Sequence, residues 1–225
     1  MKNILYVSCT QKAKKSDTLI YKSMAAYGWS TDTNTLKVIT NNTEGLSKVY
    51  NKFINAEVAE YYNHVVFVHD DVWIDDAHIK DKLNEAMHGP SKFDIVGLAG
   101  TREPKITHPA LWHLMASREH HRGYAGHIFG DKKVMTGFGA TPDRVAIVDG
   151  LFVAVNVSRA IETGWKWNEN FEFHHYDIAS CIDANAKGMR IGVWPINVFH
   201  ASPGLKSLDD VTWSNSNKKF LELYS

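Results

Sequence analysis

The sequence predicts an α/β protein, a Rossmann-like αβα sandwich with a mostly parallel central sheet. Short apolar runs alternate with helical patterns through the first hundred residues, and such alternation is typical of βαβ units. The composition agrees with a packed domain: 225 residues, of which 44% are hydrophobic and 22% charged. These observations exclude a disordered, collagenous or coiled-coil chain.

Apolar runs in the first half predict four strands, at residues 3–9, 36–40, 65–68 and 93–99. Three helices separate them, each with apolar residues at helical spacing after a capping side chain. The first is expected to follow Ser16-Asp17 and end at Gly28, and the second to follow Asn42-Thr43. The third is expected to follow Asp75 or Asp76.

The second half is less regular. Residues 100–144 are rich in Gly, His and Pro without periodicity, so long loops are expected there. Further along we expect a strand interrupted at Asp149-Gly150 (145–157), a helix (177–187) with Ile178, Cys181, Ile182 and Ala186 facing inward, a strand (190–199) with Pro195 at an edge or bulge, and a closing amphipathic helix (211–224). No linker is visible, so we expect one domain over residues 1–225.

The charge balance restricts the partners. Lys+Arg and Asp+Glu are 25 each, so no field of one sign attracts nucleic acid or an anionic membrane. Cys9 and Cys181 make neither a disulfide framework nor a metal-spaced pair. No apolar run resembles a signal peptide or is long enough to span a bilayer. We therefore expect a soluble, cytoplasmic protein without a membrane span.

Ligands of open α/β sheets bind beyond the carboxyl ends of the strands. The first strand is followed by Ser8-Cys9-Thr10-Gln11, which contains no glycine. A phosphate-cradling loop needs glycines so that backbone amides can approach the anion. The sequence contains neither a dinucleotide fingerprint nor a Walker loop, which argues against NAD enzymes and P-loop kinases.

The third strand runs into His69-Asp70-Asp71. Adjacent carboxylates at the end of a buried strand repel each other unless a cation or hydrogen-bond donors neutralise them. Oxygen ligands suit magnesium or manganese. The alternative is that these acids cap the next helix or face solvent. Asp75-Asp76 is the better capping candidate, which leaves the earlier pair free.

Two later positions have a structural and a chemical interpretation. Asp177 stands at an expected helix start, where an N-cap role is the plainer interpretation. His200 follows the last strand, which would direct it into the same crevice as Asp71. A lone histidine at such a place is more often a hydrogen-bonding group than a metal ligand.

Taken in order, these pieces resemble glycosyltransferases of the GT-A fold, near the family-two and streptomycin-biosynthesis-type glycosyltransferase-like proteins. GLSKVYN (45–51) is similar to the family's Gly-x-Ser-x-Ala-Arg-Asn helix, and VVFVHDDV (65–72) to the strand that enters its DxD motif. FDIVGLAG (93–100), Trp112 and DGLF (149–152) resemble the next blocks. WNENFEFHHYDIASCIDANAKGMRIGVWPINVFHAS (167–202) follows the family's Phe-Asp-Glu, His-x-Tyr-Asp-Ile-Asp and terminal His sequence.

Three positions depart from the family pattern. His69 occupies the first DxD position, Tyr50 replaces the usual arginine, and Ala179 replaces an aspartate two residues after the expected base. The change at 50 affects the expected nucleotide contacts, for which Lys48 is the available substitute. The change at 179 is expected to affect helix packing or acceptor binding more than chemistry.

The resemblance implies metal-dependent transfer of a sugar from a UDP-sugar, UDP-glucose-like, to an acceptor hydroxyl, with inversion and slow donor hydrolysis. It implies that Asp71 and His200 hold Mn²⁺ or Mg²⁺ and that Asp177 is the general base. Residues 1–100 would bind the nucleotide sugar and residues 101–225 the acceptor. The donor-binding residues would be Ser8, Thr10, Asn42, Lys48, Asn51, His69, Asp70, Asp149, Gly150 and Lys206, and the acceptor-binding residues Trp112, His175 and Tyr176.

Two alternatives stay open at this point. A sugar-nucleotide nucleotidyltransferase also places acids after a central strand, but it needs a glycine-rich basic loop after the first strand, and SCTQKAKK (8–15) has none. A non-catalytic nucleotide-sugar-binding module could keep the sheet and lack a competent base, and the changes at positions 50 and 179 are compatible with it. Turnover of a UDP-sugar with manganese separates it from an enzyme.

Overall fold

A seven-stranded mixed sheet forms the centre of the computed structural model, which describes residues 3–201 and 211–225. Parallel pairing joins β1 to both β2 and β3 and joins β5 to β12, whereas β11 runs antiparallel between β3 and β5. The predicted α/β fold is confirmed. The order across the sheet is β2 (Leu36–Ile39), β1 (Asn3–Cys9), β3 (Tyr62–Val68), β11 (Phe152–Asn156), β5 (Ile95–Gly97), β12 (Ile191–Val193) and β9 (Asp143–Arg144).

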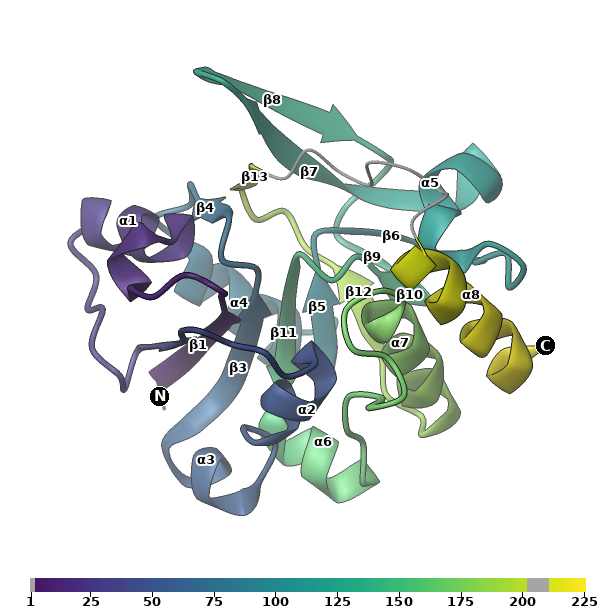
Figure 1. Ribbon diagram of the computed structural model, residues 1–225, viewed down its shortest axis with the longest axis horizontal. Coiled ribbons are helices and arrows are strands. Elements are labelled where there is room, and N and C mark those ends of the chain that lie inside the picture. The colour runs from purple at the N-terminus through teal and green to yellow at the C-terminus, as the bar shows by residue number, and fades with distance from the viewer. Residues whose placement is uncertain (1–2, 202–210) are drawn as a thin grey trace.

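A smaller second sheet lies beside the carboxyl ends of these strands (Figure 1). Its order is β10 (Ile147–Val148), β6 (Ala99–Thr101), β7 (His121–Phe129), β13 (Val198–His200) and β4 (Val72–Ile74), with β8 (Lys132–Gly137) paired to β7. The expectation of long loops over residues 100–144 is therefore wrong. This stretch contains β6 to β9 and the short helix α5 (Trp112–Met115), and the β7–β8 hairpin projects from the body.

Three expected strands each divide between the two sheets. Residues 93–99 form β5 and β6, which separate at Leu98. The strand expected at 145–157 breaks at Asp149-Gly150 as predicted and forms β10 and β11. The strand expected at 190–199 forms β12 and β13 on either side of Pro195. Because each chain segment crosses from one sheet to the other, side chains at the breaks come together near one end of the large sheet.

Helices cover both faces of the large sheet (Figure 1). The helices α1 (Leu19–Ala26) and α4 (Ile79–His88) bury Met24 and Leu83 in one core, together with alternate residues of β1 and β3. On the other face, a second core includes Tyr50 and Phe220. The helices on this face are α2 (Leu46–Asn51), α3 (Ala56–Tyr61), α6 (Val157–Thr163), α7 (Tyr176–Ala186) and α8 (Val211–Tyr224). In the described part of the chain, no helix is both long and apolar enough to cross a bilayer.

Helix starts differ from the expected caps. Thr18 caps α1 by accepting a hydrogen bond from the Tyr21 amide, and Gly45 rather than Asn42-Thr43 precedes α2. Asp76 lies two residues before the His78 cap of α4 and is buried. Nζ of half-buried Lys82 lies 2.6 Å from Oδ2 of Asp76.

The inward face of α7 also differs from the expectation. Ile178 and Cys181 are buried, as predicted. Ile182 is only half-buried and Ala186 is exposed, because Ala179 and Ala184 pack against the core instead. The helix is therefore rotated slightly about its axis from the predicted inward face.

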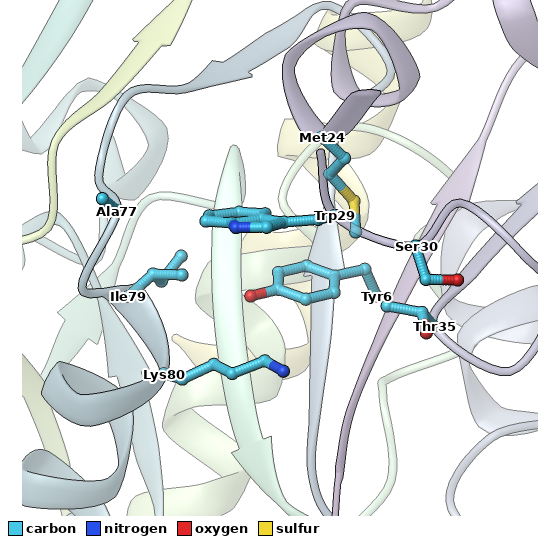
Figure 2. A pocket seen from close by; sticks show the side chains of 8 residues that line it. All are labelled: Tyr6, Met24, Trp29, Ser30, Thr35, Ala77, Ile79 and Lys80. Carbon is cyan, nitrogen blue, oxygen red and sulfur yellow. The ribbon is translucent and has the colours of Figure 1, made fainter. Parts of the chain in front are cut away.

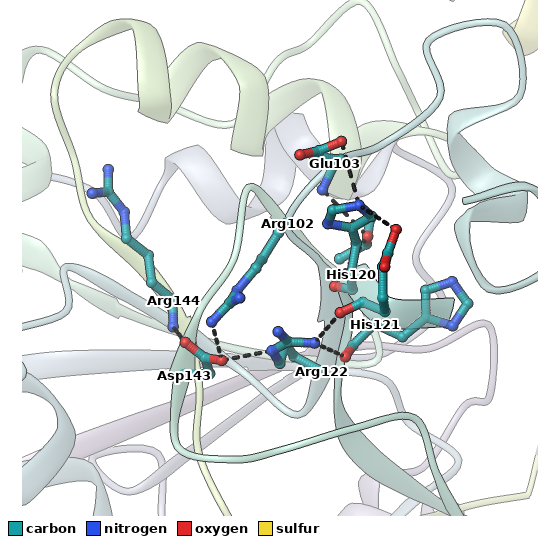
Figure 3. A network of polar contacts seen from close by, with 9 residues as sticks. Arg102, Glu103, His120, His121, Arg122, Asp143 and Arg144 are labelled. Atoms are coloured by element: carbon teal, nitrogen blue, oxygen red, sulfur yellow. Dashed lines mark hydrogen bonds and ion pairs between the residues drawn. The ribbon is translucent and has the colours of Figure 1, made fainter. Parts of the chain in front are cut away.

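A charge network joins the strands of the irregular half (Figure 3). Oδ2 of Asp143, on β9, accepts hydrogen bonds from Arg102, which follows β6, and from Nε of Arg122 on β7, the latter at 2.6 Å. Burial would raise the pKa of Asp143, but the hydrogen bonds and charge of the two guanidinium groups together lower it below its ordinary value. The Asp143 carboxylate thereby connects β9, β7 and the segment after β6, all of which lie in the stretch where the sequence showed no periodicity.

Candidate active site

Three potential metal ligands meet where β3 ends and β13 pairs with β4. His69 and Asp71 follow β3, and β13 brings His200 opposite Val72. One ligand atom from each of His69, Asp71 and His200 lies within 4.8 Å of the others. The meeting of Asp71 and His200 that the strand ends predicted is present: Nε2 of His200 lies 2.9 Å from Oδ1 of Asp71.

These atoms fit a cation. Oδ1 of Asp71 and Nε2 of His200 are buried, and their close approach lacks the alignment of a hydrogen bond. Burial would raise the pKa of Asp71 and lower that of His200, but the attraction between the two lowers the first and raises the second. A divalent cation between them would neutralise the carboxylate and occupy the nitrogen lone pair.

A tyrosine fixes which nitrogen His69 can offer to a metal. The Tyr176 hydroxyl has one proton, which it donates to the Gly150 carbonyl at 2.8 Å. Nε2 of His69 lies 3.1 Å from the same hydroxyl and must therefore be the donor in that contact. In neutral His69 the lone pair is then on Nδ1, and a hydrogen bond of this kind is what orients metal-binding histidines.

Asp177 does not cap α7. The cap is His175, whose φ of 63° lies in the left-handed region, and Asp177 stands one residue inside the helix. Oδ2 of Asp177 accepts a hydrogen bond from the Gly150 amide at 2.8 Å, and Oδ1 accepts one from the Ile178 amide at 2.9 Å. Burial, and then the nearby Asp149 carboxylate, raise the pKa of Asp177 to about 7. A carboxylate with such a pKa is suited to accepting a proton near neutral pH.

Gly150 joins the metal-ligand cluster to Asp177. A Cβ atom at this position would lie 2.5 Å from the Tyr176 hydroxyl and 2.9 Å from Cβ of Asp177, so a larger residue would push both side chains away. The Gly150 carbonyl binds Tyr176 and its amide binds Asp177. One backbone turn therefore sets the position of the candidate base relative to His69.

Part of the predicted donor-binding set gathers after β1. The Thr10 hydroxyl donates to Oδ2 of Asp70 at 2.7 Å, and Nζ of Lys12 lies 3.0 Å from the same oxygen. Ser8 is buried, and its hydroxyl has no hydrogen-bond partner among the described residues. Asp70, Thr10 and Lys12 thus form a polar group next to the metal-ligand cluster.

The remaining predicted donor-side residues have partners within the protein. Asn42 makes a local turn with Glu44, and exposed Lys48 pairs with the same glutamate at 3.2 Å. Asn51 donates to the Trp167 carbonyl and accepts from the Trp167 amide. Tyr50, at the position of the family's arginine, is a core residue whose ring packs at a tilt against Phe67 and edge-on against Trp167 and Tyr176.

The residues predicted to bind the acceptor are buried. Trp112 is 3% exposed and packs against His121 and Phe138. His175 is 2% exposed, with Nδ1 at 2.9 Å from the Ser216 hydroxyl of α8, and Tyr176 is 3% exposed. Burial leaves these rings little surface to offer an acceptor, and of the three only Tyr176 contacts a residue of the metal-ligand cluster, His69. Lys206 lies outside the described residues.

Two residues that the sequence interpretation did not select lie at the site. Lys12 contacts Asp70. The sequence could have indicated this residue, because Lys12 is the first basic residue after the first predicted strand. Phe173 is 57% exposed, and its ring stacks on His69 with centroids 6.1 Å apart. An exposed phenylalanine beside a metal-ligand cluster has no distinguishing sequence pattern.

The comparisons with known proteins place this site in a family. Residues 8–224 match the family model described as "Glycosyltransferase like family". The chain belongs to this family. The predicted resemblance and the predicted enzyme class, glycosyltransferase, are confirmed. The comparison with curated proteins gave no match.

Solved structures share the fold at low sequence identity. A197 from STIV is 11% identical with a TM-score of 0.51, over 89% of this chain and 86% of that one. S. aureus TarS is 14% identical with a TM-score of 0.52, over 90% of this chain but only 37% of TarS. These structural similarities support the GT-A fold. The match covers less than half of the length of TarS.

Proposed function

We propose that this glycosyltransferase moves a sugar from a UDP-sugar to an acceptor hydroxyl, with a divalent metal at His69, Asp71 and His200 and with Asp177 as the base. The observation that carries the proposal is the chain of hydrogen bonds that connects the metal-ligand cluster to Asp177. Tyr176 contacts His69 and Gly150, and Gly150 contacts Asp177. We also propose that residues 1–225 act as one domain, with donor binding in residues 1–100 and acceptor binding in residues 101–225.

The metal ligands favour manganese. When bound, a divalent ion supplies the positive charge that stabilises the leaving diphosphate. Asp71 provides a hard oxygen, whereas His69 and His200 provide imidazole nitrogens, which manganese accepts more readily than magnesium does. The Tyr176 hydroxyl holds His69 in the tautomer that leaves Nδ1 free for the ion.

The polar group after β1 binds the nucleoside in this proposal. Asp70 accepts hydrogen bonds from the ribose hydroxyls, and Lys12 and Thr10 hold its carboxylate in place. Ser8, Asn42, Lys48 and Asn51 complete the donor side, as the resemblance implies. No glycine-rich loop supplies amides to the diphosphate, so donor affinity depends on the metal.

Asp177 accepts the proton of the attacking hydroxyl. Its two backbone hydrogen bonds fix the carboxylate, and each oxygen keeps a second lone pair for the acceptor. Burial and Asp149 raise its pKa to about 7, which makes it a stronger base than an exposed aspartate while it still ionises near neutral pH. Attack opposite the leaving diphosphate inverts the anomeric carbon.

A thermal-shift panel of nucleoside diphosphate sugars, with and without manganese, tests the proposal. A ligand that binds the native state raises the melting temperature by mass action. We expect UDP-sugars to raise it only with manganese and ADP- or GDP-sugars to have less effect. The proposal is contradicted if no nucleotide sugar shifts the transition with the metal present.

A further inference from the structure

An exposed phenylalanine lies beside the proposed site. Phe173 is 57% exposed, whereas Phe171 and Tyr176 on the same segment are 1% and 3% exposed. The Phe173 ring stacks on His69, with centroids 6.1 Å apart and an interplanar angle of 22°, and makes an edge-to-face contact with His174. More than half of this apolar side chain therefore faces solvent next to a proposed metal ligand.

The backbone on both sides of Phe173 is anchored. The Glu172 carbonyl accepts a hydrogen bond from the Leu46 amide at 2.6 Å, and the His174 carbonyl accepts one from the Ser216 hydroxyl of α8 at 2.9 Å. These bonds hold the segment against α2 and α8, so the segment would have to break them to bring the ring into the core. A ring that is fixed in advance loses little conformational entropy when a ligand stacks on it.

The Phe173 ring lies on the side of the site that the candidate base occupies. The imidazole of His69 contacts two rings, those of Phe173 and Tyr176, and Asp177 follows Tyr176 directly in the chain. The nucleoside, in contrast, is proposed to bind at Asp70. A substrate that rests on Phe173 is therefore placed to bring a hydroxyl group to Asp177.

Other accessible aromatic side chains lie away from these groups. Phe129 is 59% exposed and stacks on His127 at the end of β7. Trp29 lines a cavity between β1 and the start of α4 (Figure 2), and neither the proposed metal ligands nor Asp177 are among the lining residues. Of the exposed Phe, Tyr and Trp rings in residues 3–201 and 211–225, Phe173 is the one that contacts a proposed metal ligand.

The proposed site makes two demands on an acceptor. A general base that removes a proton requires an alcohol hydroxyl, and a fixed phenyl ring favours a flat apolar surface. A pyranose supplies both, because the C–H bonds on one face of the ring are apolar and the hydroxyl groups project from its edge. A serine side chain or a small polyol has the hydroxyl group without the flat face.

From the exposed and anchored Phe173 ring beside His69, we infer that the acceptor is itself a sugar ring, which stacks on Phe173 and presents a hydroxyl group to Asp177. This inference rests on the proposed function and names its acceptor class. The acceptor oxygen bonds to the anomeric carbon of the donor, while the bond from that carbon to the diphosphate breaks and leaves its electron pair on the diphosphate. The hydroxyl proton passes to Asp177.

Transfer and donor hydrolysis, measured in parallel on the full chain with manganese, test the inference. The donor is the UDP-sugar that gives the largest thermal shift. The acceptors are methyl glucoside, methyl galactoside and methyl N-acetylglucosaminide, with glycerol as an alcohol that has no flat face. Release of UDP without acceptor measures hydrolysis, and mass spectrometry of the product measures transfer. We expect at least one methyl glycoside to be glycosylated with saturation, and glycerol to show no saturation at the same concentrations.

Phe173→Leu keeps an apolar side chain but removes the flat ring. It should raise the KM for the glycoside about fivefold, as expected for one lost aromatic contact, whereas Phe173→Tyr keeps the ring and should restore the wild-type KM. Because the ring also contacts His69, each variant is compared by its ratio of transfer to hydrolysis. Phe129→Leu is the matched control, at an exposed ring stacked on another histidine, and should keep the wild-type KM.

The outcomes separate this inference from the proposed function. If a UDP-sugar is hydrolysed but no methyl glycoside accepts its sugar better than glycerol does, the acceptor class is wrong and the proposed function stands. The same conclusion follows if Phe173→Leu has the wild-type KM, or if it lowers transfer and hydrolysis equally. If no UDP-sugar is bound or hydrolysed with manganese, the proposed function fails and the inference fails with it.

Discussion

At the scale of single residues, the most consequential finding concerns Asp177. The sequence favoured a helix cap at this position, and the structure places the residue inside the helix instead. An N-cap aspartate tolerates asparagine, because either side chain caps equally well. Asp177 instead accepts an amide N–H on each of its oxygens, and an asparagine there can accept only one. Its substitution therefore removes one of the two hydrogen bonds that a half-buried carboxylate accepts, and it affects both chemistry and stability.

We predict that Asp177→Asn lowers transfer about a hundred- to ten-thousand-fold, the usual contribution of a general base. Donor hydrolysis, with water as the acceptor, measures this without a known acceptor. UDP affinity with manganese should be unchanged. Full hydrolysis by the variant would remove Asp177 from the base role.

The raised pKa of Asp177 also predicts how the difference in unfolding free energy between the wild type and this variant depends on pH. The folded pKa of Asp177, about 7, is above its ordinary value of 3.8, so the folded state binds the proton more tightly. The stabilisation that comes from this tighter proton binding is complete below pH 3.8, and it is lost as the pH rises to about 7. The unfolding free energy of the wild type, relative to the variant, should fall over this range by up to about 1.4 kcal/mol per pH unit.

The sequence predicted part of the site because strand ends meet in space. Asp71 and His200 are 129 positions apart and still form the predicted pair. The tautomer of His69 could not be predicted, because it depends on the Tyr176 hydroxyl 107 residues away. Burial of Trp112 and the internal partners of Asn51 also arise only from tertiary packing.

At the scale of elements, the turn between β10 and β11 positions the candidate base. We predict that Gly150→Ala displaces Tyr176 and Asp177, since its Cβ atom would lie 2.5 Å from the Tyr176 hydroxyl. Overpacking of this kind lowers the unfolding free energy by about 1–3 kcal/mol, and donor hydrolysis should fall with it. Chemical denaturation measures the first effect.

Gly137→Ala is the matched control for this turn. Gly137 lies at the end of β8, and a Cβ atom there meets nothing within 4 Å. Its substitution should leave both stability and hydrolysis unchanged. Equal behaviour of the two variants would show that the close approach at Gly150 does not hold the site together.

Two of the elements that the sequence did not predict, β8 and α3, have little burial. Every residue of β8 is exposed, so its sequence, KKVMTG, lacks an alternating pattern, and the strand exists through its pairing with β7. The helix α3 has no fully buried residue and was not predicted. Conversely, the strand at residues 3–9 and the helix at 211–224 were predicted with the observed bounds. The strand buries a continuous apolar run from Ile4 to Val7, and the helix buries Trp213 and Phe220 on one face.

At the scale of the whole molecule, the core under the large sheet contains an ionisable group that makes stability depend on pH. His64, on β3, is fully buried, with its ring 4.8 Å from that of His88. Burial, and then the neighbouring His88, lower the pKa of His64 to about 4. The unfolded chain binds a proton near pH 6.5, where folded His64 does not. Stability is therefore complete above pH 6.5 and is lost as pH falls toward 4.

We predict that His64→Asn reduces the slope of unfolding free energy between pH 4 and 6.5 by up to about 1.4 kcal/mol per pH unit. Denaturant titrations at several pH values measure it, with His108→Asn, at an exposed position, as the control. Because Asp177 contributes with the opposite sign, each group is read from the difference between the wild type and its own variant. An unchanged slope in His64→Asn would contradict the burial of a neutral imidazole.

The central claim is that His69, Asp71 and His200 hold the metal through which the nucleotide binds. Calorimetric titration of the full chain with UDP, in manganese and in chelator, tests it most directly. The account predicts tight binding only with manganese, abolished in Asp71→Ala and weakened in His69→Ala and His200→Ala, with Asp75→Ala, outside the cluster, as the control. Equal UDP affinity in manganese and in chelator would contradict it and would instead indicate side-chain cations such as Lys12.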